Sequence, residues 1–104
     1  MLDMESLTAK TLRLNTEWKV AHGIVGLRIL KAEGVRTPFL DDLCHASIPS
    51  LMPKELAQSL EEIQSLIEGL VLGNVDVNSV LAKTERLFED IENCRFEDMI
   101  EEAV

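Results

Sequence analysis

The sequence has few aromatic residues, few helix breakers and very little cysteine. Its 104 residues include no Tyr, one Trp, three Phe, three Pro, five Gly and two Cys. So few aromatic rings leave little surface on which nucleic-acid bases could stack. The scarcity of Pro and Gly, without alternating runs of β-branched residues, favours helices over strands. We expect Cys44 and Cys94 to be reduced thiols, with a single bridge between them as the alternative.

Long hydrophobic runs are missing as well. The longest purely aliphatic run is Leu70-Val71-Leu72, which is far too short to span a bilayer. The first five residues carry acids where a secretory signal would carry bases, and no apolar segment follows them. The sequence therefore predicts a cytoplasmic protein that does not enter the membrane.

Positive charge is scarce, and the excess of negative charge is concentrated in one half of the chain. Ten Lys and Arg stand against 19 Asp and Glu, for a net charge of −9, and all of this excess lies in residues 53–104. A chain of this sign repels phosphate backbones, so we expect no direct binding to nucleic acid. The acidic half predicts either a solvated face that keeps the protein in solution or a surface that meets a basic protein partner.

The clearest helical pattern lies in the C-terminal half. Apolar positions recur there at spacings of four and three along two stretches: Leu56, Leu60, Ile63, Ile67 and Leu70, then Val80, Thr84, Leu87, Ile91 and Cys94. Between them, Gly73 can end one helix and Asp76 can cap the next. The pattern predicts helices over residues 53–72 and 77–100 that pack as an antiparallel hairpin.

The N-terminal half predicts a long helix over residues 4–33 and a short one over 38–46, which begins at Thr37, as the cap, and Pro38. In the long helix, the same four-three spacing predicts a buried stripe formed by Leu7, Thr11, Leu14, Trp18, Ala21 and Val25. Trp18 is therefore expected in the core, or else as an aromatic anchor at an interface. Gly23 and Gly26 indicate a break near residue 22, close approach of another helix, or room for a partner.

These elements together predict an all-α fold. We expect a single domain over residues 1–104, built as a small four-helix bundle of the up-down type with a short second helix. Residues 24–30 are apolar nearly all round the helix, which also suggests a homodimer.

No set of residues points to catalysis. His22, His45, Cys44 and Cys94 do not have the spacing of a metal motif, and no phosphate-binding loop or nucleophile motif occurs. The carboxylates lie on faces that look solvated, without the apolar pocket that raises the pKa of a catalytic acid. The sequence therefore predicts no enzymatic activity, no catalytic residue, no cofactor and no metal site.

One short segment has a recognisable pattern, namely Ala21-His22-Gly23-Ile24-Val25-Gly26. It resembles the phosphorylation motif of histidine phosphotransfer domains, in which an exposed histidine on a four-helix bundle accepts a phosphoryl group. The resemblance implies His22 as the phosphoacceptor and Gly26 as the small residue that lets a response regulator approach. The family's lysine three residues after the histidine is Val25 here. Without that resemblance, His22 is expected to be partly buried and packed near Trp18.

The leading hypothesis is a non-enzymatic adaptor, chaperone, or regulator or inhibitor that binds a protein partner with a basic surface. Electrostatic attraction would be followed by docking on an apolar groove. The predicted partner-binding residues are Glu55, Glu61, Glu62, Glu68, Glu85, Glu89 and Trp18. The alternatives are histidine phosphotransfer through His22 and a structural subunit that assembles with itself.

Overall fold

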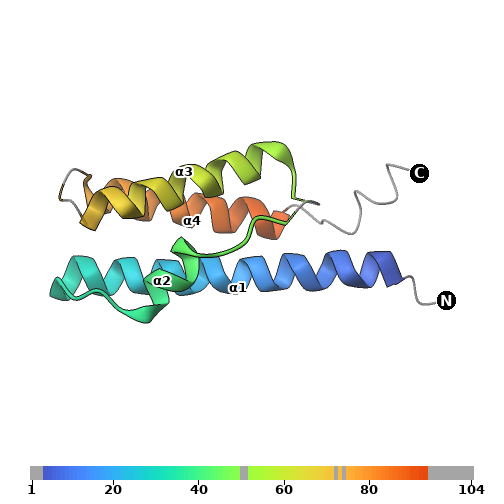
Figure 1. Cartoon of the computed structure of the whole chain (residues 1–104), viewed down its shortest axis with the longest axis horizontal. Helices are drawn as coiled ribbons and strands as arrows, with labels where there is room; N and C mark the ends of the chain where they lie inside the picture. Colours follow the sequence, from blue (N-terminus) through green and yellow to red (C-terminus); the bar gives the residue numbers. More distant parts are fainter. Residues whose placement is uncertain (1–3, 50–51, 72, 74, 94–104) are drawn as a thin grey trace.

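The computed structural model describes residues 4–49, 52–71, 73 and 75–93, with the side chains of residues 4–6 and 71 left aside. Within these ranges all regular secondary structure is helical, and four helices form one bundle (Figure 1). The predicted all-α four-helix bundle is therefore confirmed over the described part of the chain.

Helix α1 (Met4–Glu33) sets the length of the molecule. Thirty helical residues extend about 45 Å, close to the longest dimension of the fold, 49 Å. The helix runs through Gly23 and Gly26 without a break. It ends at Gly34, whose positive φ of 70° suits glycine and whose amide donates to the Leu30 carbonyl at 2.8 Å.

Helix α2 (Pro38–Cys44) packs on the second half of α1, and this contact explains the two glycines. A β-carbon at Gly26 would lie only 2.7 Å from the backbone nitrogen of Leu40, and one at Gly23 would overlap the Leu43 side chain. Of the three explanations that the sequence left open, close approach of another helix is therefore the one observed.

The two ends of α2 are held differently. At its C-terminal end, the Gln64 side-chain amide donates to the carbonyls of Leu43 and Ala46, at 3.1 and 2.8 Å. At its N-terminal end, Thr37 occupies the cap position, but its hydroxyl is buried without a partner. The prediction of a side-chain cap by Thr37 is wrong, because the Leu40 amide donates to the Thr37 backbone carbonyl at 3.2 Å instead.

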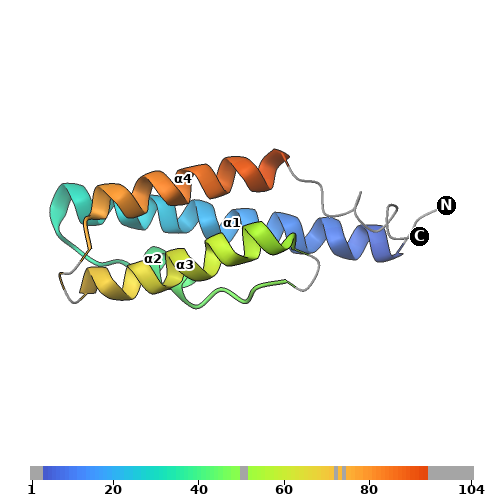
Figure 2. The same cartoon turned by 90° about the horizontal axis from the view of Figure 1, so that it is seen from above.

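Helices α3 (Lys54–Val71) and α4 (Val77–Asn93) pack against each other, and α4 returns alongside α3 (Figures 1 and 2). The expected stripes face inward: the fully buried side chains include Leu60, Ile63, Ile67, Val80, Thr84, Leu87 and Ile91. Gly73 ends the first helix region with a φ of 76°, and the Asp76 carboxylate accepts from the Asn78 amide at 3.3 Å. The predicted extension of α4 through Cys94 to residue 100 lies outside the described residues.

The prediction of which face of α1 is buried is wrong. Its buried residues are Ala9, Thr16, Val20, Ile24 and Leu27, whereas Leu7, Leu14, Trp18 and Val25 are exposed. Trp18 is 58% exposed and is not a core residue. The physical reason is that α2 can approach α1 only over Gly23 and Gly26, so the core forms on the glycine side.

The helices have no membrane-spanning character in the part that the structure describes. None of them there is both long enough and apolar enough to cross a bilayer.

Candidate functional site

The glutamates predicted to bind a partner are all exposed, but they do not share one face. Glu62 of α3 pairs with Lys83 of α4. Glu68, also on α3, lies close enough to Cys44 of α2 to affect its pKa. Glu85 and Glu89 of α4 face α1 instead. The remaining two, Glu55 and Glu61, are exposed on α3. The acidic strip expected on the C-terminal hairpin is therefore divided among several sides of the molecule.

The exposed apolar stripe of α1 lies almost opposite its buried face. At 100° per residue, Val25 is turned about 160° from Leu27 around the helix axis. Leu14, Trp18 and Val25 are exposed by 49%, 58% and 43%. Helix α1 therefore has two apolar faces, one in the core and one open to solvent.

A groove follows this stripe where α1 meets α4. One hollow of about 500 Å³ includes Ala21, Val25 and Phe88 among its lining residues, and a second of about 240 Å³ includes Leu14 and Trp18. Both hollows share Ala21 and Phe88, so they form one continuous apolar surface, which we call the α1/α4 groove. An exposed apolar surface of this kind commonly marks an interaction site.

The rim of the α1/α4 groove is acidic. Glu85, Glu89 and Glu92 line its α4 side, spaced four and three residues apart, so they form a single row along the helix. Among the described residues, Arg28 is the only cation that lines the groove, and it lies 3.6 Å from Glu85. The rim therefore carries more negative than positive charge.

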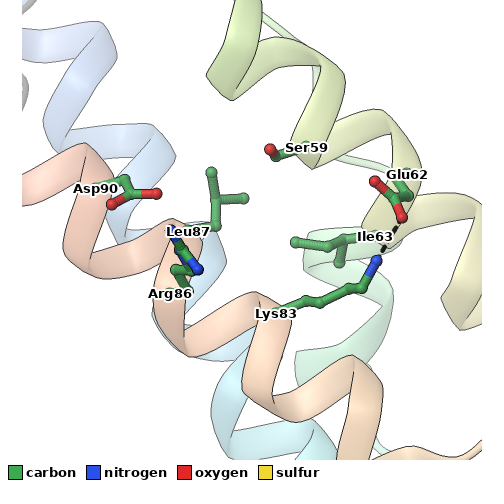
Figure 3. Close-up of a pocket in the computed structure, with 7 residues that line it drawn as sticks. All are labelled: Ser59, Glu62, Ile63, Lys83, Arg86, Leu87 and Asp90. Carbon is green, nitrogen blue, oxygen red and sulfur yellow. Dashed lines mark hydrogen bonds and ion pairs between the residues drawn. The ribbon is translucent and has the colours of Figure 1, made fainter.

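The opposite groove, between α3 and α4, has a different balance (Figure 3). Its hollow of about 130 Å³ is lined by two carboxylates, from Glu62 and Asp90, and two cations, from Lys83 and Arg86. Lys83 reaches across the groove to Glu62. The residues that line this groove therefore carry no net charge of their own.

His22 lies beside the α1/α4 groove in a small polar and aromatic cluster. Its Nδ1 is 3.0 Å from Oδ2 of Asp42, and its ring lies 4.1 Å from that of Trp18 and 5.3 Å from that of Phe39 between centroids. The expected packing of a partly buried His22 near Trp18 is confirmed. The space above Gly26 that the phosphotransfer resemblance requires is filled by Leu40.

The remaining reactive groups that the structure describes do not assemble into a site. Among the described residues, no three His, Cys, Asp or Glu side chains gather closely enough to hold a metal ion. Burial raises the pKa of the Cys44 thiol above its ordinary value, the Glu68 carboxylate adds to this shift, and Arg36 opposes it. A thiol with a raised pKa is a weak nucleophile at neutral pH.

Sequence reasoning named only part of the groove. It selected Glu85, Glu89 and Trp18 but missed Phe88 and Glu92. It also placed Leu14 and Val25 in the core. The signal that could have corrected this was the pair Gly23 and Gly26, which marks the side of α1 that another helix covers.

Comparison of the chain with protein-family models, curated protein sequences and solved structures found no match.

Proposed function

We propose that this protein is a non-enzymatic adaptor, chaperone, or regulator or inhibitor that binds a protein partner with a basic surface through the α1/α4 groove. The observation that carries the proposal is Trp18, a large aromatic side chain that is 58% exposed at the edge of an apolar groove. Tryptophan is among the residues most often found at the energetic centre of protein interfaces. The proposal includes the cytoplasmic setting, to which the low cysteine content is suited.

Binding would proceed in two stages. The net charge of −9 attracts a basic partner over a distance of about one Debye length, and apolar contacts in the groove then hold it. Glu55, Glu61, Glu62 and Glu68 lie outside the groove and act in the first stage. Trp18, Glu85 and Glu89 act in the second as well, because they contact the docked partner.

The test is affinity capture from a lysate of the source cell with three baits, at low and at high salt. We expect the wild-type chain to recover a stoichiometric partner that is lost at high salt. Trp18→Ala should lose this partner at low salt too, whereas Val35→Ala, which truncates an exposed apolar side chain in the loop after α1, should retain it. Identical recoveries from all three baits, or none from any, would contradict the proposal.

A second measurement separates the two stages. Charge reversal at Glu61, Glu62 and Glu68 should slow association and flatten its salt dependence, but leave the dissociation rate nearly unchanged. If the triple variant associates as fast as the wild type, steering by these glutamates is refuted.

Self-assembly is the second candidate, and the exposed stripe of α1 favours it. Leu7, Leu14, Trp18 and Val25 occupy a four-three repeat of the type that forms helix–helix seams between chains. Light scattering at several protein concentrations tests this candidate. A monomer at every concentration would rule out a homodimer through this face.

A further inference from the structure

The α1/α4 groove has the length and the walls of a helix-binding groove. From Leu14 to Arg28 it follows 15 residues of α1, a rise of about 21 Å. Its two walls are helices, and a third helix packs well into the furrow between two others because its side-chain ridges fit there. Ala21, which is small, lies between the larger Leu14 and Val25, so a bulky anchor of a ligand helix can enter at that point.

The charged residues at the rim of the groove indicate which charge a partner should carry. The row formed by Glu85, Glu89 and Glu92 runs parallel to the groove for two turns of α4, and Arg28 is already close to Glu85. Glu17, on the α1 side, is paired with Arg13 at 2.9 Å. Docking against the α4 wall therefore leaves two carboxylates, from Glu89 and Glu92, to be neutralised by the incoming partner.

We infer that the α1/α4 groove binds an amphipathic helix of a partner protein, with an apolar stripe that enters the groove and with Lys or Arg along the flank that meets α4. This inference rests on the proposed function and names the class of its partner. Apolar side chains at i, i+3 or i+4, and i+7 of the ligand helix contact Leu14, Val25 and Phe88. Basic side chains beside them pair with the glutamate row.

A second copy of this chain fits the groove less well. Each copy carries a net charge of −9, so two acidic chains would repel each other as they met. The α3/α4 groove is also less suitable for a basic helix, because its lining has as many cations as carboxylates and Lys83 already pairs with Glu62. Charge complementarity thus selects both the groove and the occupant.

The fluorescence of Trp18 can measure binding to the α1/α4 groove. Trp18 is the only Trp in the chain, and it lines the groove, so its fluorescence reports occupation of this site. The probe is a Trp-free synthetic peptide of about 18 residues, or five turns, with a leucine stripe and flanking lysines. Two matched probes carry the same leucine stripe with glutamate flanks, or the same composition in scrambled order. All are titrated into the whole 104-residue chain.

We expect the lysine peptide to shift Trp18 emission to shorter wavelength and to protect it from a neutral quencher such as acrylamide. Its affinity should exceed that of both matched peptides by about tenfold or more at low salt. The double variant Glu89→Lys, Glu92→Lys should lose about tenfold in affinity. The matched variant Glu55→Lys, Glu61→Lys, which has the same net charge but leaves the groove intact, should lose much less.

Several outcomes would overturn the inference. Equal binding of the lysine and glutamate peptides would remove the role of charge. An equal loss of affinity for the lysine peptide in the two double variants would show that only the net charge of the protein matters. Protection of Trp18 that rises with the concentration of the protein itself, without peptide, would assign the groove to a second copy.

The inference and the proposed function can fail separately. If capture recovers a partner that depends on Trp18 but the lysine peptide does not displace it, the helix inference fails and the proposed function stands. If the peptide binds as expected but capture recovers no Trp18-dependent partner, the proposed function fails. The preference of the groove for a basic amphipathic helix is then still supported.

Discussion

Replacement of Gly26 by alanine is the most direct test of how the bundle is assembled. In an isolated helix this change is favourable by about 1 kcal/mol, because glycine is a poor helix former. Here the new β-carbon would lie 2.7 Å from the backbone nitrogen of Leu40 and 3.0 Å from its Cα. Backbone atoms cannot rotate away, so α2 has to move as a whole.

The expected size of the effect follows from these opposing contributions. Overpacking a buried contact costs about 1–3 kcal/mol, and a clash with backbone atoms lies in the upper part of this range, at about 2–3 kcal/mol. The gain in helix propensity offsets about 1 kcal/mol of this cost. We therefore expect Gly26→Ala to lower the free energy of unfolding by about 1–2 kcal/mol, and the melting temperature by about 5–10 °C. Asn15→Ala, at an exposed position of the same helix, is the matched control and should be neutral or slightly stabilising.

Thermal and urea unfolding followed by far-ultraviolet circular dichroism provide the measurement. The reasoning is refuted if Gly26→Ala is as stable as the wild type or more stable. In that case α2 does not lie against α1 at this position, and the explanation for the exposed stripe of α1 fails with it.

Three further predictions concern side chains whose roles the structure separates. Trp18→Ala should change the free energy of unfolding by about 0.5 kcal/mol or less, whereas Leu27→Ala should lower it by about 2–5 kcal/mol. Both values are measured by urea unfolding, and an equal loss of stability in the two variants would place Trp18 in the core. Asp76→Ala removes a used helix cap and should cost about 1 kcal/mol, whereas Thr37→Val removes a buried hydroxyl without a partner and should be neutral or stabilising; a destabilised Thr37→Val would show that the hydroxyl has a partner. Because the pKa of Cys44 is raised, its thiolate forms only at higher pH. In a Cys94→Ser variant, alkylation of Cys44 should therefore be slower than alkylation of a free thiol at neutral pH, and the two rates should converge as the pH rises. Equally fast alkylation at neutral pH would contradict the raised pKa.

The buried faces of α3 and α4 were readily predicted because each of these helices has a single apolar stripe. Ile63 stands between Glu62 and Gln64, and Leu87 follows Glu85 and Arg86, so only one rotation of each helix buries the apolar side chains. Periodicity then determines both the helix and its inner face. For these two helices, local pattern and global packing agree.

Helix α1 could not be oriented in the same way. Its residues form two apolar stripes, one through Trp18 and one through Val20 and Leu27, and periodicity does not distinguish them. The choice is made by Gly23 and Gly26, through contacts with α2. The groove could not be predicted from the sequence either, because Phe88 meets the α1 stripe only after chain segments more than 60 residues apart have packed together.

The order in which the helices contact one another has a kinetic consequence. Helix α1 packs on α2, and α3 packs on α4, through short connections, whereas α1 meets α4 across most of the chain. Contacts that close short loops form early in folding, and those that close long loops form late. We therefore expect two helical hairpins to form first and to join last along the seam between α1 and α4. Because the groove is that seam, neither hairpin possesses it alone, and a ligand that occupies it binds only the completed fold. Such a ligand stabilises the whole protein in proportion to the logarithm of its concentration, so that recognition of a partner and completion of folding are one linked equilibrium.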